Sequence, residues 1–561
     1  MSIDKKRGNK YMNKLFKITL IIICCAILFS GCGSSMDGAS MSESSMAASE
    51  STIAAGTRDN GQVGEPQNKD SGDTVDVIIP QDDVKVDFSE AIGETERQQN
   101  TVNDSKTSSN SDTLFKDYGV NPFIDSQESR FSTFALDVDT ASYTKAKSYI
   151  ESGELPPKDS VRVEEFINYF KRSYPQPLSD DKFSIYTEMA PSAFNRGYHV
   201  LEVGIQGKNI EASMMKDTCL TFVIDVSGSM DMDNRLGLVK KSLKVLIGQM
   251  GKNDKIGIAV YGTNGRKLLK HTSAANKEEI LSAISELTPE GSTNAAEGLQ
   301  IGYKMAAEAF ISEGNNRIIL CTDGLANEGL TDAEQILKSV KEYKQKGITL
   351  TTLGFGMDNY NDIFLEKLAD NGDGNYAYIN DMDEAQRVLQ NQMVSTLQVI
   401  AKDAKAQIEF DSETVKSYRL IGYENRILNK EDFRDNSVDA GEIGAGHAVT
   451  ALYEIKLKEN TTDNVGTVRL RYKDVDSNKV KEVSKNIKTS SICDNFYNAT
   501  PRFRFLNMVS QTAEILRGSP WASNTKLEDV YKILTKDMDG LQMTKEDMGF
   551  IEMVKTAINI D

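Results

Sequence analysis

The strongest constraint on the fold is a regular alternation of apolar runs and helical patterns between Thr218 and about Ile400. The segment after the first run places apolar residues at the spacing of a helix whose one face is buried. Strands that alternate with helices favour a doubly wound, mainly parallel sheet, so we expect a Rossmann-like α/β domain over residues 217–400. The predicted strands are residues 220–226, 256–261, 318–321, 348–353 and 376–379.

Side chains that carry oxygen follow the strands of this predicted sheet. Asp225, Ser227 and Ser229 alternate with other residues directly after the first strand, and Asp323 follows a later one. Thr293 falls in a loop just before a predicted helix. Ligands of parallel sheets bind beyond the carboxyl ends of the strands. Carboxylates and hydroxyls form an oxygen-only donor set that suits Mg²⁺, with Mn²⁺ or Ca²⁺ as alternatives.

Residues 218–400 closely resemble the von Willebrand factor type A (vWA) domain. Asp225, Ser227 and Ser229 match the DxSxS part of its metal-ion-dependent adhesion site, and Thr293 and Asp323 match the second-loop threonine and the third-loop aspartate. The resemblance implies that the hydroxyls bind the ion directly and the aspartates mostly through water. It further implies an open coordination position that accepts a Glu or Asp carboxylate from a partner protein, and hence a binding module with no catalysis.

The segments on both sides also resemble domains of a bacterial lipoprotein family. We therefore expect an N-terminal vWA-associated domain over residues 113–216 and a C-terminal domain of unknown function over residues 401–561. Strand patterns fill residues 401–490 of the latter, and helical patterns fill residues 499–561. The stretches that carry this resemblance are residues 134–143, 155–157, 161–165, 418–426 and 439–447.

Strand patterns on the two sides of the α/β domain predict one β-sandwich. Strands with an exposed face need partners that cover their edges and apolar faces. We therefore expect the two sets of strands to pair, with the α/β domain inserted between them as a unit. The sets are residues 183–188 and 198–205 before the domain, and residues 406–410, 448–457 and 465–472 after it.

The first 32 residues predict a lipoprotein signal. Six basic residues precede an apolar run at residues 18–29, which is shorter than the roughly 17–25 residues of a membrane-spanning helix. The sequence Phe-Ser-Gly-Cys that ends at Cys32 resembles the bacterial lipobox, in which the cysteine is diacylated and becomes the mature N-terminus. We expect cleavage of residues 1–31 and a lipid anchor on Cys32 at the extracytoplasmic face of the cell membrane. A short uncleaved anchor is the alternative.

Residues 32–112 are rich in Ser, Gly, Asp and Glu, and we interpret them as a disordered acidic tether. The formal charge of the whole chain is −18. Removal of residues 1–31, with six basic residues and one acidic residue, makes it −23. The sequence therefore argues against nucleic-acid binding, which needs a basic face. We expect an envelope or extracellular protein as the partner.

Two other functions stay open at the level of sequence. Asp137 and Asp139 follow an apolar strand and fit the nucleophile pattern of haloacid-dehalogenase-type, Mg²⁺-dependent phosphatases, although the strand–helix repeats that such a site needs are missing after them. A metal-free structural scaffold of the cell envelope is the third possibility. His199, His271 and His447 lie far apart, which argues against a histidine-based zinc site. Cys219 and Cys321 are expected to be buried thiols.

Overall fold

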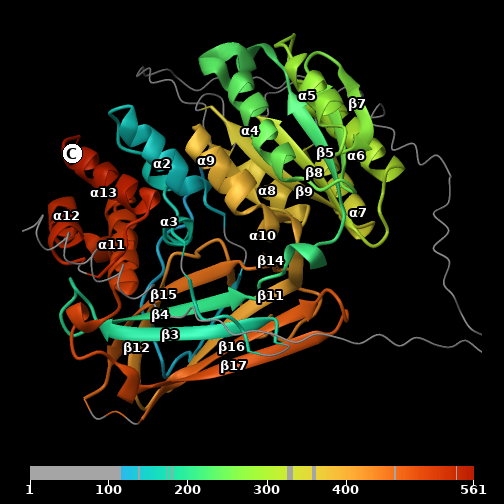
Figure 1. The fold of residues 1–561 in the computed structure, drawn as a ribbon. Coiled ribbons are helices and arrows are strands. Elements are labelled where there is room, and N and C mark those ends of the chain that lie inside the picture. The colour runs from blue at the N-terminus through green and yellow to red at the C-terminus, as the bar shows by residue number, and fades with distance from the viewer. Residues whose placement is uncertain are drawn as a thin grey trace, which may run out of the picture. The chain divides into compact units, whose positions relative to one another are not determined.

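The computed structural model describes residues 115–136, 139–171, 173–178, 181–324, 333–356, 362–459, 461, 463–538 and 540–560. The predicted signal peptide, Cys32 and the predicted tether lie outside the described residues. Three structural parts share the described chain: an α/β domain, a β-sandwich and a helical layer (Figure 1). No helix within these described ranges is long and apolar enough to cross a membrane.

The α/β domain is built on a six-stranded sheet in the order β10-β9-β8-β5-β6-β7. The neighbouring strands pair in parallel except β6 and β7, which are antiparallel. The predicted doubly wound, mainly parallel sheet is thereby confirmed. Its strands are β5 (Thr218–Asp225), β6 (Lys255–Tyr261), β7 (Gly265–Ser273), β8 (Asn315–Thr322), β9 (Ile348–Phe355) and β10 (Tyr376–Ile379).

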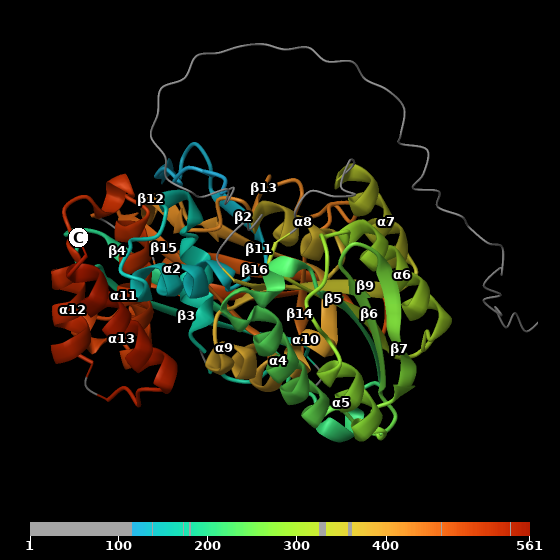
Figure 2. The same cartoon turned by 90° about the horizontal axis from the view of Figure 1, so that it is seen from above.

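Helices cover both faces of this sheet because successive side chains of each strand point to opposite faces. On β5, Phe222 packs into a core with α4 (Arg235–Gln249) and α5 (Lys277–Ser285). Its neighbour Val223 packs on the other face, where α6, α7 and α8 lie. Figure 2 shows β5 and β6 between α4 and α6. The three helices of the second face are α6 (Ala295–Glu308), α7 (Ala333–Gln345) and α8 (Asp362–Asn371).

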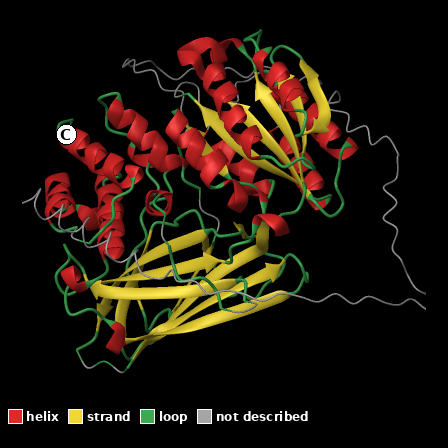
Figure 3. Cartoon of the chain, viewed as in Figure 1, coloured by secondary structure: helices red, strands yellow, loops and turns green. Residues whose placement is uncertain are grey.

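The β-sandwich combines strands from both sides of the α/β domain, as the sequence predicts. One sheet has the order β1-β12-β15-β4-β3, and the other has the order β13-β2-β11-β16-β17, with β14 paired to β11. Figure 3 shows these strands as a layered group apart from the strands of the α/β domain. The strands before the domain are β1 (Ile124–Asp125), β2 (Phe131–Ala135), β3 (Phe183–Pro191) and β4 (His199–Gly207). Those after it are β11 (Val399–Phe410), β12 (Val415–Ile421), β13 (Ile427–Leu428), β14 (Gly441–Gly444), β15 (Ala448–Leu457), β16 (Asn464–Asp474) and β17 (Val480–Lys488).

Pairing across the insertion explains why the flanks fold together. β4 pairs with β15 over eight residue pairs, and β2 pairs with β11 over five. Side chains from both sheets, among them Phe134, Leu201 and Phe410, share one buried core. β4 differs from the expected half-exposed strand, because Leu201 faces that core while Val200 joins the core of the helical layer.

The helical layer joins the two ends of the described chain. α2 (Ala141–Glu151) and α3 (Val163–Tyr169) pack with α11 (Pro501–Leu516), α12 (Leu527–Lys536) and α13 (Lys545–Ile558) around one apolar core. Apolar side chains at helical spacing along α3 and directly after it lie in this core: Val163, Phe166, Ile167 and Phe170 are at most 3% exposed. α2 also packs beside β10, so the helical layer contacts the edge of the α/β domain.

Candidate metal centre

Asp225 and Asp323 lie at the carboxyl ends of two adjacent parallel strands. β5 ends at Asp225, and its register with β8 places Ile224 opposite Cys321. Asp323 directly follows the last residue of β8. Both aspartates are buried, with exposed fractions of 0% and 4%. This end of the sheet is where ligands of parallel sheets bind.

Both carboxylate oxygens of Asp225 are held by neighbouring groups. Oδ1 accepts a hydrogen bond of 2.8 Å from the Ser227 backbone N–H, and Oδ2 accepts one of 2.9 Å from the Thr322 hydroxyl. The Thr322 hydroxyl is in turn 3.2 Å from the Gly324 backbone N–H, which donates to it. Asp225 therefore ties the loop after β5 to the end of β8.

The two serine hydroxyls connect Asp225's loop to Asp323. The Ser227 and Ser229 hydroxyl oxygens are 3.0 Å apart, and the Ser229 hydroxyl donates to Asp323 Oδ1 at 3.1 Å. Ser227 is 2% exposed, whereas Ser229 is half-buried. The structure thus joins four of the five predicted ligands in one hydrogen-bonded network, in which Asp225 accepts from the Ser227 backbone N–H.

Thr293 lies in the loop that packs against the β5 loop. The Gly228 N–H donates to the Gly291 carbonyl at 3.0 Å, and the Glu290 N–H donates to the Val226 carbonyl at 2.5 Å. Gly291 has φ +65°, and a Cβ there would lie 1.9 Å from the Thr263 hydroxyl, so only glycine lets the loop follow this path. Thr293 is half-buried two residues further on. The fifth predicted ligand is therefore carried by a loop that is hydrogen-bonded to the loop of Ser227 and Ser229.

Burial and mutual repulsion disfavour negative charge at this cluster. Burial, together with the nearby Asp323 carboxylate, raises the pKa of Asp225 to about 6, although hydrogen bonds from Ser227 and Thr322 oppose the shift. Burial also raises the pKa of Asp323, and the Arg235 guanidinium opposes that shift. Two buried carboxylates whose ionisation is costly would be stabilised by a cation between their loops.

The donor set fits a divalent metal ion. The groups joined in the network are the carboxylates of Asp225 and Asp323 and the hydroxyls of Ser227 and Ser229, which have the hard oxygen chemistry that Mg²⁺ and Mn²⁺ accept. The neutral hydroxyls and the two carboxylates give fewer negative charges than an all-carboxylate site. An ion held in this way stays attractive to a further negatively charged ligand.

Arg235 is the residue of this site that the sequence analysis missed. It is the first residue of α4 and is 3% exposed, and its Nη1 donates to Asp323 Oδ2 at 2.7 Å. The only sequence signal is a charged residue at the start of a helix that follows the DxSxS loop. Such a residue is normally solvated, so its burial could not be predicted from position alone.

Comparisons with known proteins match most of the chain. The model for the "von Willebrand factor type A domain" matches residues 220–392, and the model for "Uncharacterized protein YfbK, C-terminal" matches residues 395–560. A model named "von Willebrand factor" matches residues 109–202. The "Uncharacterized protein YfbK" of Escherichia coli (strain K12) is 38% identical over 443 residues, which cover 74% of this chain and 76% of that protein. The chain belongs to the YfbK family.

More distant similarities cover smaller parts of this YfbK-family chain. Inter-alpha-trypsin inhibitor heavy chain H1 of Sus scrofa is 31% identical over 202 residues, which cover 34% of this chain and only 22% of that protein. A solved structure, von Willebrand factor type A from Catenulispora acidiphila, has 15% identity and a TM-score of 0.37, and the match covers 60% of this chain and 79% of that chain. vWA domains mediate protein–protein interactions and commonly bind a divalent metal at their adhesion site.

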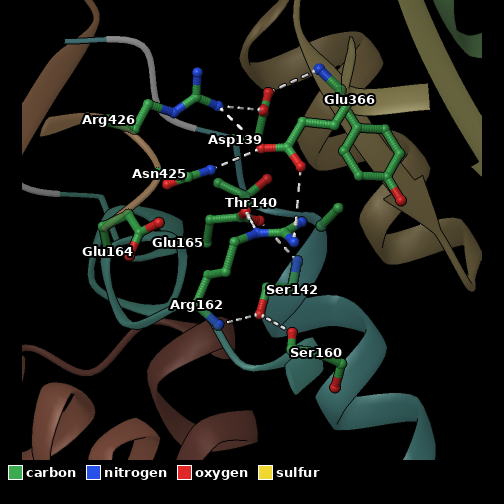
Figure 4. A network of polar contacts seen from close by, with 12 residues as sticks. Asp139, Thr140, Ser142, Ser160, Arg162, Glu164, Glu165, Glu366, Asn425 and Arg426 are labelled. Atoms are coloured by element: carbon green, nitrogen blue, oxygen red, sulfur yellow. Dashed lines mark hydrogen bonds and ion pairs between the residues drawn. The ribbon is translucent and has the colours of Figure 1, made fainter. Parts of the chain in front are cut away.

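The second candidate centre, Asp139, is part of a buried junction in this YfbK-family chain (Figure 4). Its Oδ1 accepts from the Tyr376 N–H at 2.8 Å, and its Oδ2 is 3.0 Å from Arg426 Nη2. Asn425 and Arg426 also contact Glu366 of α8, at 2.9 and 3.5 Å. Both oxygens of Asp139 are thus committed to structural contacts, which disfavours the acid–base role in the phosphatase hypothesis. Asp137, the nucleophile in that hypothesis, lies outside the described residues.

A further acidic group does not resemble a metal centre. Carboxylate oxygens of Asp373, Asp439 and Glu442 lie within 4.8 Å of one another. Two lysines form ion pairs with this group: Lys402 Nζ is 2.8 Å from Asp373, and Lys344 Nζ is 2.7 Å from Asp439. The two lysine charges offset two of the three carboxylate charges, so we interpret the group as an ion-pair network that links α7 to β11.

The histidines and cysteines take structural positions. The His271 ring lies against Gly257, and its Nε2 is 2.9 Å from the Thr221 hydroxyl, far from any metal-ligand arrangement with His199 or His447. Cys219 and Cys321 are buried free thiols, as predicted. Burial raises the pKa of Cys219 to about 11, which keeps the thiol protonated and unreactive.

Proposed function

We propose that this chain binds a partner protein through a Mg²⁺-dependent adhesion site formed by Asp225, Ser227, Ser229, Thr293 and Asp323. The observation that carries the proposal is the hydrogen-bonded network of four of these residues. Asp225 accepts the Ser227 backbone N–H, and the side-chain oxygens of Ser227, Ser229 and Asp323 follow one another at 3.0 and 3.1 Å. Mn²⁺ or Ca²⁺ are alternative ions. A bound divalent ion would supply a positive centre with a coordination position open to a carboxylate.

Each residue of the site has a separate task in this proposal. Asp225 orients the β5 loop by accepting the Ser227 N–H, so that the hydroxyls of Ser227 and Ser229 stay on the same side. Asp323 offers Oδ1 to the site while Arg235 holds its Oδ2. Within the described part of the chain, the Thr293 hydroxyl has no hydrogen-bond partner, which leaves it available as a ligand.

We place this binding at the extracytoplasmic face of the cell membrane, with Cys32 as the lipid attachment point. The support is the short apolar run after a basic segment and the lipobox-like sequence that ends at Cys32. The acidic segment 32–112 would hold the domains away from the bilayer. The partner is then an envelope or extracellular protein that presents a Glu or Asp.

The proposal assigns no catalytic step to the chain. The phosphatase alternative would require Asp139 to move protons, yet its oxygens are bonded to Tyr376 and Arg426. A metal-free scaffold is the remaining alternative, and it differs from the adhesion site by one measurable property. A scaffold gains no stability from divalent ions, whereas an adhesion site does.

Metal binding and partner binding test the proposal together. Isothermal titration with Mn²⁺ compares wild type, Asp225→Ala and the control Asp254→Ala, which removes a carboxylate bonded to Thr218 N–H at the opposite end of the sheet. Wild type and Asp254→Ala should bind Mn²⁺, and Asp225→Ala should not. Wild type should also retain a protein from envelope extract in Mg²⁺ and release it in EDTA. Equal Mn²⁺ binding by all three proteins would contradict the proposal.

A further inference from the structure

Arg235 is a buried cation in direct contact with the proposed metal site. Its side chain is 3% exposed, and Nη1 donates to Asp323 Oδ2 at 2.7 Å and lies 3.5 Å from the Ser229 carbonyl. The carboxylate of Asp233 approaches Nη2 only to 4.0 Å and is 87% exposed. A buried guanidinium is costly without a charged partner. Asp323 is a buried ionic partner of Arg235, and this pair is shielded from solvent.

The backbone encloses this guanidinium at a specific point. Gly356, after β9, has φ +89°, and a Cβ at this position would lie 2.3 Å from Arg235 Nε. Glycine is needed there both for the backbone conformation and for the close approach. The charge is therefore fixed between the DxSxS loop, Asp323 and the chain after β9, rather than swinging into solvent as a surface arginine does.

We propose that Arg235 is a positioning residue that sets the charge of the adhesion site, so that the loaded site prefers an anionic ligand at the expense of metal affinity. This inference rests on the proposed function. Two carboxylates and one guanidinium carry a formal charge of −1 without metal and +1 with a divalent ion. Without the arginine charge these values would be −2 and 0. The guanidinium therefore repels the metal ion but attracts a carboxylate that approaches it.

Arg235 also decides which oxygen Asp323 offers to the site. Arg235 Nη1 donates to Asp323 Oδ2, so the other oxygen, Oδ1, faces Ser229. The Ser229 hydroxyl donates to Oδ1 at 3.1 Å. A bonded carboxylate cannot rotate to present both oxygens to one ion. Asp323 therefore acts as a one-oxygen group, which is compatible with an ion that keeps water and an open position.

The test separates the charge of Arg235 from its hydrogen bond. Arg235→Gln keeps a donor for Asp323 and removes the charge, whereas Arg235→Lys keeps the charge. Mn²⁺ is titrated into each protein, and acetate at constant ionic strength is then added while the water-proton relaxation caused by bound Mn²⁺ is recorded. Acetate that replaces a water on Mn²⁺ lowers this relaxation. Arg235→Gln should bind Mn²⁺ at least tenfold more tightly and acetate at least tenfold more weakly than wild type. Arg235→Lys should stay within about threefold of wild type for both.

The outcomes distinguish this inference from the function on which it rests. Wild type that binds Mn²⁺ no better than Asp225→Ala would overturn the adhesion site itself. Wild type that binds Mn²⁺, with unchanged Mn²⁺ and acetate affinities in Arg235→Gln, would overturn only the role of Arg235. Circular dichroism checks that each variant is folded. If Arg235→Gln does not fold, Arg235→Lys still decides, because a tenfold change in either of its affinities contradicts a role based on charge.

Discussion

The Ser229 hydroxyl donates to Asp323 Oδ1 at 3.1 Å, although the two residues are 94 positions apart in the sequence. They meet because β5 and β8 are neighbours in the sheet. The strands between them in the sequence, β6 and β7, lie on the other side of β5. The site therefore exists only when the central strands are paired. Any change that loosens this pairing should disturb metal binding before it removes the helices.

Asp225→Ala should abolish stabilisation by Mg²⁺ without unfolding the chain. Mg²⁺ at about 100 times its dissociation constant should stabilise wild type by about 2.7 kcal/mol. The variant lacks the carboxylate that orients Ser227 and should gain nothing. In EDTA the variant should unfold at or above the wild-type temperature, since a buried carboxylate whose pKa is raised to about 6 has been removed. Thermal unfolding in Mg²⁺ and in EDTA measures both effects, and a Mg²⁺-dependent rise in the variant would contradict the assignment.

Thr293→Ala should weaken metal binding less than Asp225→Ala does. It removes one neutral hydroxyl and leaves the loop anchored by the Gly228–Gly291 and Glu290–Val226 backbone hydrogen bonds. We expect a loss of about tenfold in Mn²⁺ affinity, at the lower end of the effects of altered metal surroundings. Thr293→Ser keeps the hydroxyl and should bind Mn²⁺ as wild type does. Isothermal titration compares the Mn²⁺ affinities of these four proteins, and equal affinities for Thr293→Ala and wild type would exclude Thr293 as a ligand.

The sequence predicted those parts of the fold that depend on local periodicity. Apolar runs of a buried parallel strand have a fixed length and spacing, so β5, β6, β8, β9 and β10 could be located. The DxSxS loop could be placed because strand ends in such sheets point to one edge. β7 could not, because it is a charged edge strand, with Arg266, Lys267 and Lys270 among nine residues. β7 pairs antiparallel with β6 and follows it without an intervening helix, so it departs from the strand–helix alternation.

Other features depend on contacts that no local pattern encodes. Arg235 is buried because Gly356 and Asp323 enclose it, and both are more than 80 positions away. The cap of α12 shows the same limit at short range. Thr525 and Glu528 fit the capping-box pattern, yet the helix begins at Leu527, one residue later than this pattern predicts, and the Asp529 carboxylate accepts the Lys526 N–H at 3.3 Å. Leu527 packs into the helical core, a contact that the local pattern does not encode.

Cys32→Ala should release the protein from the membrane or leave an uncleaved precursor. The variant removes the thiol that would be acylated, and no other step in the proposed anchoring can replace it. Labelling with a palmitate analogue and membrane fractionation measure the two effects. Cys493→Ala is a matched control, since it removes a half-buried thiol of the folded part and should not change labelling. Normal labelling of Cys32→Ala would contradict the prediction.

The stability of the chain should fall in mildly acidic solution because His271 is buried in its neutral form. Burial and the Lys255 charge lower the pKa of His271 to about 4, against about 6.5 when unfolded. The unfolded state therefore binds more protons between these values, and stability is lost as pH falls from about 6.5 toward 4. The loss should be about 2 kcal/mol after solvent screening. Urea unfolding at pH 7 and pH 5 should show a smaller pH dependence for His271→Gln, and an NMR titration of His271 with a midpoint near 6.5 would refute the explanation.

Arg426 should contribute more to the free energy of unfolding than an exposed ion pair does, because it joins three segments inside the protein. Its guanidinium contacts Asp139 at 3.0 Å, Glu366 at 3.5 Å and Asp370 at 3.4 Å, and its side chain is 9% exposed (Figure 4). Arg426→Met would leave Asp139 and Glu366 buried without this charge. Loss of one partner of a buried pair costs about 3–5 kcal/mol. Urea unfolding should therefore show a loss of that size.

A double-mutant cycle separates the ion pair from general disruption. Asp139→Asn keeps the acceptor for the Tyr376 N–H, so Arg426→Met combined with Asp139→Asn should recover part of the lost stability. The exposed pair Lys267–Glu308, with side chains 38% and 55% exposed, gives the control: Lys267→Met should change stability by less than about 1 kcal/mol. Strictly additive losses at Arg426 and Asp139 would show that the two residues do not stabilise each other.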